Sequence, residues 1–246
     1  MILKVAVKRV TKKTKYSALT DLLREEIISG RLLPGSRITV AEVALRYGIS
    51  QMPVREALKQ LAGEGLIIFL PRKGARVVPI NVDFVNHVYD LRGAIESLLV
   101  RLCVPHINNA TMNKLDDLCR QSELAAEAGD VKRLLSINRE FHDSLNRLSG
   151  NPVALELYDR YTKLMGRLRQ KYGVRPNRVS EIAKGHATLV QALREQDADR
   201  LGNLVILQCE LAKNDLISLM DDERKSQPEN SLDATTAMLV QNSAGK

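Results

Sequence analysis

The stretch Ile49-Ser-Gln-Met-Pro-Val-Arg-Glu-Ala-Leu58 decides how the N-terminal third of this 246-residue chain folds. Ser50 is predicted to cap a helix, because serine favours the position just before the first turn. Pro53 is tolerated in that turn, since the first amides of a helix have no intrahelical acceptor. Apolar side chains then recur at helical spacing, at Ala57, Leu58 and Leu61. The stretch therefore predicts a helix that buries one face and ends at Gly65.

Two more helices are predicted before this stretch. Apolar residues at helical spacing indicate a helix over 16–29 that ends at Gly30. The capping-box pattern Thr39-Val-Ala-Glu42 then opens a short helix that ends at Gly48. Only a tight turn separates this short helix from the one that follows, which is typical of a helix-turn-helix.

A hairpin is predicted after the third helix. The runs 66–70 and 75–80 are rich in β-branched and other apolar residues, and they flank the turn-forming Pro71-Arg-Lys-Gly74. Three helices followed by a hairpin indicate a winged helix-turn-helix domain over residues 15–80. Residues 1–14 are basic without a sustained apolar period, and we expect them to form a flexible arm.

The positive charge of the chain is concentrated in this N-terminal part. Residues 1–80 contain 15 Lys and Arg against 6 Asp and Glu, a net charge of +9. Residues 81–246 contain 22 against 23, a net charge of −1. A short basic domain joined to a neutral one indicates a polyanionic partner at the N-terminal end, although an ordinary solvated surface would give the same numbers.

The composition argues against secreted, zinc-ribbon and membrane proteins. The three cysteines, Cys103, Cys119 and Cys209, are odd in number and far apart, which indicates neither a disulfide framework nor a zinc ribbon. The N-terminus lacks the apolar core of a signal peptide, and no 18-residue apolar run follows. We therefore expect a soluble, cytoplasmic protein with no membrane contact.

Candidate DNA contacts lie in the first turn of the third helix and at the tip of the hairpin. Base edges of the major groove come within reach of polar side chains in such a turn. Gln51 suits adenine, Arg55 suits guanine or a phosphate, and Ser50 suits a phosphate. The hairpin tip Arg72-Lys73-Gly74 could approach the DNA backbone closely. Each residue alone could belong to an ordinary solvated surface, but together they favour DNA binding.

From residue 81 onward the pattern changes to long helical periods. The sequence predicts a C-terminal all-α bundle over residues 81–222, joined through a hinge at 81–83, and a disordered polar tail over 223–246. The predicted helices span 84–104, 111–128, 131–149, 152–172, 178–195 and 197–220. The fold class is therefore mainly α, with the β-hairpin as the only predicted sheet structure.

Polar side chains of this bundle could converge on a ligand pocket. Asn138 and His142 are four residues apart and share a helical face, whereas His186 and Gln208 belong to two later helices. Spacing alone does not establish such a site, because a single histidine on a helix is more often a hydrogen-bonded core residue. Arg92 could anchor a carboxylate, or it could pair with Glu96 on the helix surface.

Four segments of the N-terminal domain also resemble the GntR family of bacterial regulators: 30–35, 49–58, 61–66 and 72–77. The resemblance implies that Ser50, Gln51, Met52, Arg55 and the residues Arg72, Lys73 and Gly74 of the wing touch double-stranded operator DNA. It also implies a homodimer that acts on transcription, as a repressor by default. The family pattern has Arg and then Thr where this chain has Gln51 and Met52, so the resemblance predicts an altered base preference.

Residues 84–220 resemble the FCD ligand-binding domain of the FadR subfamily, and their six helices resemble its VanR-like branch. The resemblance rests on 89–96, 138–142, Asn151-Pro152 and Gly185-His186. It implies an organic-acid effector, for which Arg92, Asn138, His142, His186 and Gln208 are the candidate contacts. It also implies a divalent metal, Zn²⁺ or Ni²⁺, on Asn138, His142 and His186. The family's last histidine position is occupied by Gln208, whose neutral amide is a weaker ligand for these metals than imidazole.

Two other functions are compatible with parts of the sequence. His142-Asp143 is the residue pair of metal phosphohydrolases, but the further ligands that such enzymes need, nominally His87 and Asp197, have no supporting context. We therefore expect no enzymatic activity. An architectural DNA-binding dimer without an effector would share the same N-terminal domain.

Overall fold

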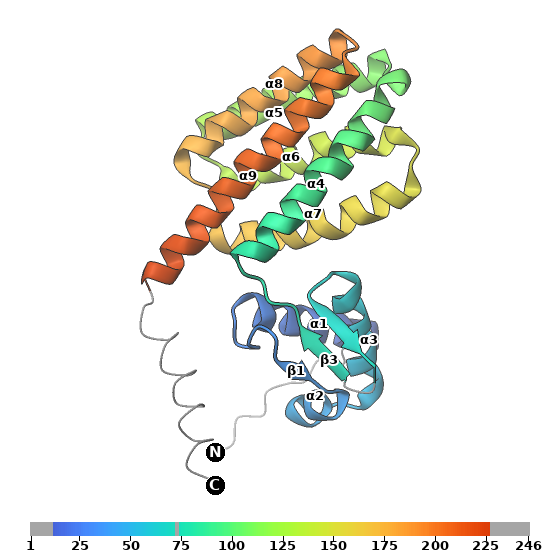
Figure 1. Cartoon of the computed structure of the whole chain (residues 1–246), viewed down its shortest axis with the longest axis vertical. Helices are drawn as coiled ribbons and strands as arrows, with labels where there is room; N and C mark the ends of the chain where they lie inside the picture. The colour runs from blue at the N-terminus through green and yellow to red at the C-terminus, as the bar shows by residue number, and fades with distance from the viewer. Residues whose placement is uncertain (1–11, 72–73, 227–246) are drawn as a thin grey trace, which may run out of the picture. The chain divides into compact units, whose positions relative to one another are not determined.

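The computed structural model describes residues 12–71 and 74–226, which divide into two compact units (Figure 1). The first unit comprises the described residues within 1–95 and 151–171, and the second those within 96–150 and 172–246. The predicted mainly α fold is confirmed: an N-terminal winged helix-turn-helix is followed, up to residue 226, by helices alone. The predicted arm up to residue 11, Arg72, Lys73 and the tail from residue 227 lie outside the described residues.

The winged helix-turn-helix contains three helices and three strands. These are α1 (Lys12–Ile28), β1 (Arg37–Ile38), α2 (Val40–Tyr47), α3 (Gln51–Gly63), β2 (Ile67–Leu70) and β3 (Gly74–Val77). Helix α1 begins four residues before the predicted start, so residues 12–14, expected in the flexible arm, are helical. Lysine is a good helix former that carries no apolar period, and the periodicity therefore missed this first turn.

Helix α2 has the predicted capping residues at both of its ends, whereas the start of α3 differs from the prediction. Thr39 Oγ1 accepts from the Glu42 amide at 3.2 Å, and Glu42 Oε2 accepts from the Thr39 amide at 3.1 Å, which completes the capping box. Gly48 ends α2 with φ of 62°, a left-handed conformation that glycine adopts without strain. Ser50 occupies the N-cap position of α3, but its side chain makes no capping hydrogen bond. The predicted Ser50 side-chain cap is therefore wrong.

The sheet is antiparallel with the strand order β1-β3-β2, and β1 was not predicted. Two residues are too short for a sequence signal, and β1 exists because Arg37 and Ile38 pair with Arg76 and Ala75 of β3. Gly74 starts β3 with φ of +80°, and a Cβ there would lie 3.1 Å from the Ile38 carbonyl oxygen. The close approach of β1 thus requires glycine at the first residue of β3, next to the tip of the hairpin.

Six helices follow, as predicted: α4 (Val82–Cys103), α5 (Asn109–Glu127), α6 (Val131–Asn146), α7 (Pro152–Tyr172), α8 (Pro176–Arg194) and α9 (Ala198–Ser226). Helix α9 extends six residues past its predicted end, so residues 223–226 of the predicted tail are helical. In the second unit, α5, α6 and α8 pack against one another around a core that includes Leu115, Phe141 and Leu189 (Figure 1). Among the described helices, none combines the length and apolarity needed to span a bilayer.

Candidate DNA-binding surface and effector site

The first turn of α3 is divided between the core and the solvent. Val54, Ala57 and Leu58 are buried, whereas the predicted contacts Ser50, Gln51, Met52 and Arg55 are all exposed. Residues 51, 52 and 55 lie within one helical turn, so their side chains share one surface. Because Ser50 makes no capping bond, its hydroxyl is not engaged by the backbone of α3.

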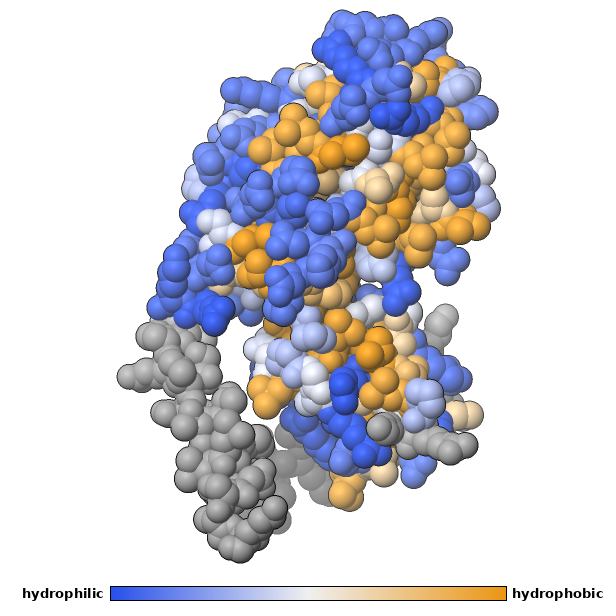
Figure 2. All heavy atoms as spheres, in the orientation of Figure 1, coloured by the Kyte–Doolittle hydropathy of each residue, from blue (hydrophilic) through white to orange (hydrophobic). Residues whose placement is uncertain are grey.

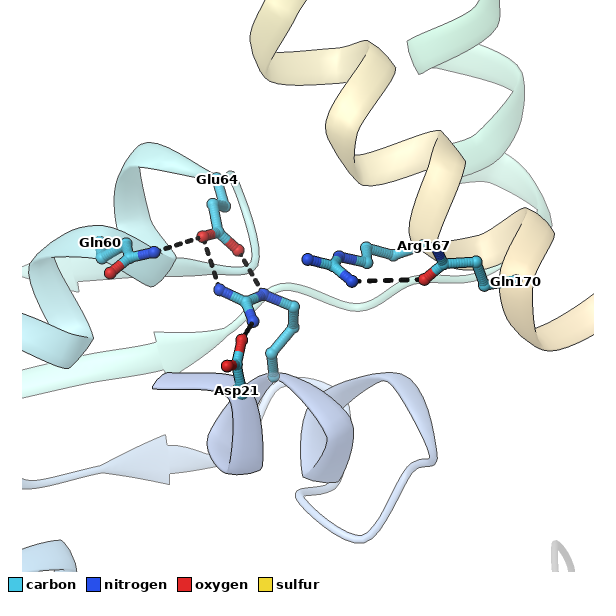
Figure 3. A network of polar contacts seen from close by, with 6 residues as sticks. Asp21, Gln60, Glu64, Arg167 and Gln170 are labelled. Atoms are coloured by element: carbon cyan, nitrogen blue, oxygen red, sulfur yellow. Dashed lines mark hydrogen bonds and ion pairs between the residues drawn. The ribbon is translucent and has the colours of Figure 1, made fainter. Parts of the chain in front are cut away.

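A forked ion pair holds the end of this helix against α1 (Figure 3). Arg24, which is 6% exposed, donates from Nε to Glu64 Oε2 at 2.7 Å and from Nη2 to Glu64 Oε1 at 2.8 Å. Asp21 accepts from Nη1 of the same guanidinium, and Gln60 donates to Glu64 Oε1 at 3.1 Å. The hydrogen bond to Glu64 raises the pKa of Arg24, against the opposing effect of burial. This network fixes α3 on its scaffold, which a recognition helix requires.

A second fork holds α2 on the same scaffold helix. Arg46 donates from both terminal nitrogens to the carboxylate of Glu26, at 3.1 and 3.2 Å. The Glu26 side chain is 8% exposed, whereas that of Arg46 is 55% exposed. Helix α1 thus makes one ionic contact to each helix of the helix-turn-helix, and in both contacts the partner on α1 is buried.

The sheet adds cations that the sequence patterns did not single out. Arg37 of β1 lies opposite Arg76 of β3 in the strand register, and both side chains are exposed. Like charges directly opposite each other in a sheet are unfavourable unless an anion or solvent screens them. Gly74, the described residue of the predicted wing tip, is also exposed. The pairing of β1 could not have been found from spacing, because 37 and 76 are remote in sequence.

Three of the predicted effector residues come together inside the second unit. His186 of α8 is fully buried, and its Nε2 lies 3.0 Å from Asn138 Oδ1 of α6. Its Nδ1 lies 3.1 Å from Ser122 Oγ of α5, and its ring stacks on Phe141 with centroids 4.3 Å apart. The amide oxygen can only accept, so Nε2 carries the proton and Nδ1 accepts from the serine hydroxyl. Burial, together with repulsion from His142, lowers the pKa of His186 to about 3.

His142 connects these residues to Glu96, which the sequence suggests only as an ion-pair partner of Arg92. Its Nδ1 lies 3.7 Å from Oε2 of Glu96, whose side chain is 2% exposed. The ring centroids of His142 and His186 are 6.0 Å apart. Cys209 Sγ of α9 lies 4.0 Å from the other carboxylate oxygen of Glu96. Helices α4, α5, α6 and α8 therefore contribute to one polar cluster, defined here as Glu96, Ser122, Asn138, His142 and His186, and Cys209 of α9 lies beside it.

Gln208 and Arg92 occupy different surroundings. A Cβ on Gly185 would lie 2.8 Å from Gln208 Nε2, so the absence of a side chain at 185 makes room for this amide beside α8. Arg92 lies on α4 in the first unit, half-buried, with its guanidinium carbon 5.2 Å from the centre of the Tyr89 ring. His87 and His106, which fit no predicted site, are exposed.

The donor set does not suit the divalent metal that the resemblance implies. Both ring nitrogens of His186 have protein partners, and the fourth position carries the amide of Gln208. Two imidazoles and two neutral amides are a weak donor set for Zn²⁺ or Ni²⁺. Across residues 12–71 and 74–226, no group of three or more His, Cys, Asp or Glu side chains is arranged to hold a metal ion.

Comparison with known proteins agrees with this architecture. Residues 15–77 match the family described as bacterial regulatory proteins, gntR family, and residues 87–206 match the FCD domain. The chain is 30% identical, over 176 residues, to the Nta operon transcriptional regulator of Aminobacter aminovorans, covering 69% of this chain and 80% of that protein. The chain belongs to the GntR family.

Other GntR relatives agree in sequence and in structure. The transcriptional repressor RspR of Escherichia coli K12 is 25% identical over 178 residues, covering 72% of this chain and 78% of the repressor. The structure of E. coli McbR/YncC superposes with a TM-score of 0.58 at 21% identity, covering 85% of this chain and 98% of McbR, which supports the fold. This GntR protein is thus a DNA-binding transcriptional regulator and not an enzyme, as predicted.

Proposed function

We propose that this regulator is a homodimeric repressor that binds operator DNA through residues 15–80 and responds to an organic acid bound within residues 81–222. The observation that carries the proposal is the polar cluster around His186, which four helices of the C-terminal region build outside the winged helix-turn-helix. An effector bound there, with different affinities for two arrangements of the chain, would shift their populations. Relatives named as repressors, such as RspR, support the sign of regulation.

The DNA contacts are proposed on charge and, for the residues that the structure describes, on exposure. Gln51 and Arg55 would contact bases, while Ser50, Gly74 and the cations Arg72, Lys73, Arg37 and Arg76 would approach phosphates. Arg55→Ala should weaken operator binding by about 1–3 kcal/mol if it contacts a base. Lys73→Ala and Arg76→Ala should each weaken binding to all sequences alike and reduce the salt slope by about 1. Effects of these two variants confined to one base position would contradict the phosphate assignment.

The effector is proposed to be a carboxylate because arginine suits planar bidentate recognition. Asn138, His142 and Gln208 of the second unit are candidate polar contacts that require no metal, and Arg92 of the first unit is a separate candidate for holding a carboxylate. Thermal-shift screening of organic acids, followed by operator binding with each stabilising acid, tests this assignment. Arg92→Ala should abolish the shift. If no acid stabilises the chain and no metabolite changes operator affinity, the architectural DNA-binding dimer becomes the better description.

The homodimer is proposed through a surface of α4 and α9 in the second unit. These helices pack closely because Gly202 leaves space for Ser97 and Arg101. Beside that contact they expose large apolar side chains, namely Leu98, Leu102, Ile206, Leu207 and Leu211. Figure 2 shows apolar side chains among hydrophilic ones on the visible face of the helices. Leu98→Glu should lower the molar mass measured by light scattering, whereas Leu124→Glu, on exposed α5 surface, should not.

A further inference from the structure

Met52 is a large apolar side chain that lies on the proposed DNA-binding surface. Met52 lies in the first turn of α3 and is 63% exposed, while Val54 two residues later is 0% exposed. The side chain therefore plays no part in the core of the winged helix-turn-helix. Its neighbours on the surface are the polar Gln51 and the cation Arg55, both exposed.

We propose that Met52 contacts the C5-methyl group of a thymine in the major groove and, with Gln51, directs this turn to A·T base pairs. The proposal rests on the function proposed above, since it requires α3 to enter the groove. The thymine methyl is the one apolar group on the major-groove edges of the four bases. Methionine suits such a contact, because its flexible, polarisable thioether adapts to the position of a small apolar partner.

The neighbouring glutamine favours the same base pair. Gln51 can donate to N7 and accept from N6 of adenine, and adenine is the partner of thymine. No charged side chain occurs between Ser50 and Val54, so this turn offers no bidentate cation for guanine. Arg55, one turn further along α3, keeps the capacity to contact a guanine or a phosphate. The expected operator half-site therefore has A·T base pairs where Gln51 and Met52 contact the major groove. Arg55 makes a separate contact, to a guanine or a phosphate.

The experiment removes the methyl group without changing the base pair. Binding sites are first selected from randomised duplexes with the full-length protein. Each thymine of the selected site is then replaced by deoxyuridine, which lacks only the C5-methyl group. Affinity of the wild-type chain should fall about fourfold at one thymine in each half-site, the factor expected for one buried methyl-sized group. Met52→Ala should bind the thymine and uracil sites alike, and Met52→Leu should retain most of the discrimination.

Leu45→Ala serves as the matched control, because Leu45 is an 87% exposed apolar residue of α2 outside the recognition helix. It should discriminate between thymine and uracil as the wild type does. The proposal is overturned if no thymine is sensitive to methyl removal, if Met52→Ala keeps the sensitivity, or if the selected sites carry guanine at this step. If the full-length chain selects no sequence at all, the proposed DNA-binding surface is refuted, and the proposed thymine contact is refuted with it.

Discussion

Replacing Glu64 by glutamine tests whether the fork to Arg24 positions the recognition helix. The change keeps the size of the side chain but removes the charge that receives two hydrogen bonds, at 2.7 and 2.8 Å, from a guanidinium that is 6% exposed. Hydrogen bonds to charged groups contribute about 1.5–3 kcal/mol each, and a broken buried pair costs about 3–5 kcal/mol. Glu64 is 22% exposed and Asp21 still holds Arg24, so we expect a loss of about 2–3 kcal/mol.

Hydrogen–deuterium exchange on the full chain measures this loss where it occurs. Peptides from α1 and α3 should exchange roughly 30- to 150-fold faster in Glu64→Gln, because each 1.4 kcal/mol changes the open population about tenfold. Glu56→Gln is the control: it removes an exposed pair with Lys59 from the same helix, and exchange should change about twofold or less. Equal exchange in the two variants would refute the idea that the Arg24–Glu64 fork holds α3.

Three further predictions concern the second unit. Gln208→His supplies the third imidazole of the family's metal pattern. Zn²⁺ or Ni²⁺, at a free concentration 100 times its dissociation constant, should therefore stabilise this variant against unfolding by about 2.7 kcal/mol and leave the wild type unchanged. An equal stabilisation of the wild type would show that its own donors bind the metal. The pKa of His186 is about 3 when folded and near its ordinary value of 6.5 when unfolded, so the unfolded chain takes up a proton that the folded chain does not. The free energy of unfolding should therefore fall as pH drops from 6.5 towards 3, by up to about 1.4 kcal/mol per pH unit, and His186→Asn should flatten this dependence in denaturation measurements. Burial raises the pKa of Cys103 to about 12 and that of Cys119 to about 11, so neither thiol of the folded chain should react with iodoacetamide at mildly alkaline pH; rapid labelling seen by mass spectrometry would mean that the helices open locally.

The sequence by itself determined the elements whose signals are local. The capping box of Thr39 and Glu42, the left-handed Gly48 and the apolar spacing of α3 are set by residues within a few positions of one another, and all were predicted. The same holds for the six later helices, whose apolar faces repeat with the helical period. Ends that carry no apolar period, such as the lysines of α1 and the last residues of α9, were missed for that reason.

Only the tertiary structure decided which remote residues meet. Glu96 lies beside His142, and Ser122 beside His186, because helices remote in sequence pack against one another; no spacing along the chain encodes those distances. Arg24 and Glu64, 40 residues apart, form their ion pair only once α1 and α3 pack. Strand β1 exists because β3 offers it hydrogen bonds, and it brings Arg37 opposite Arg76. Local periodicity specifies an element and its buried face, whereas a site made of several elements depends on packing that acts across the whole chain.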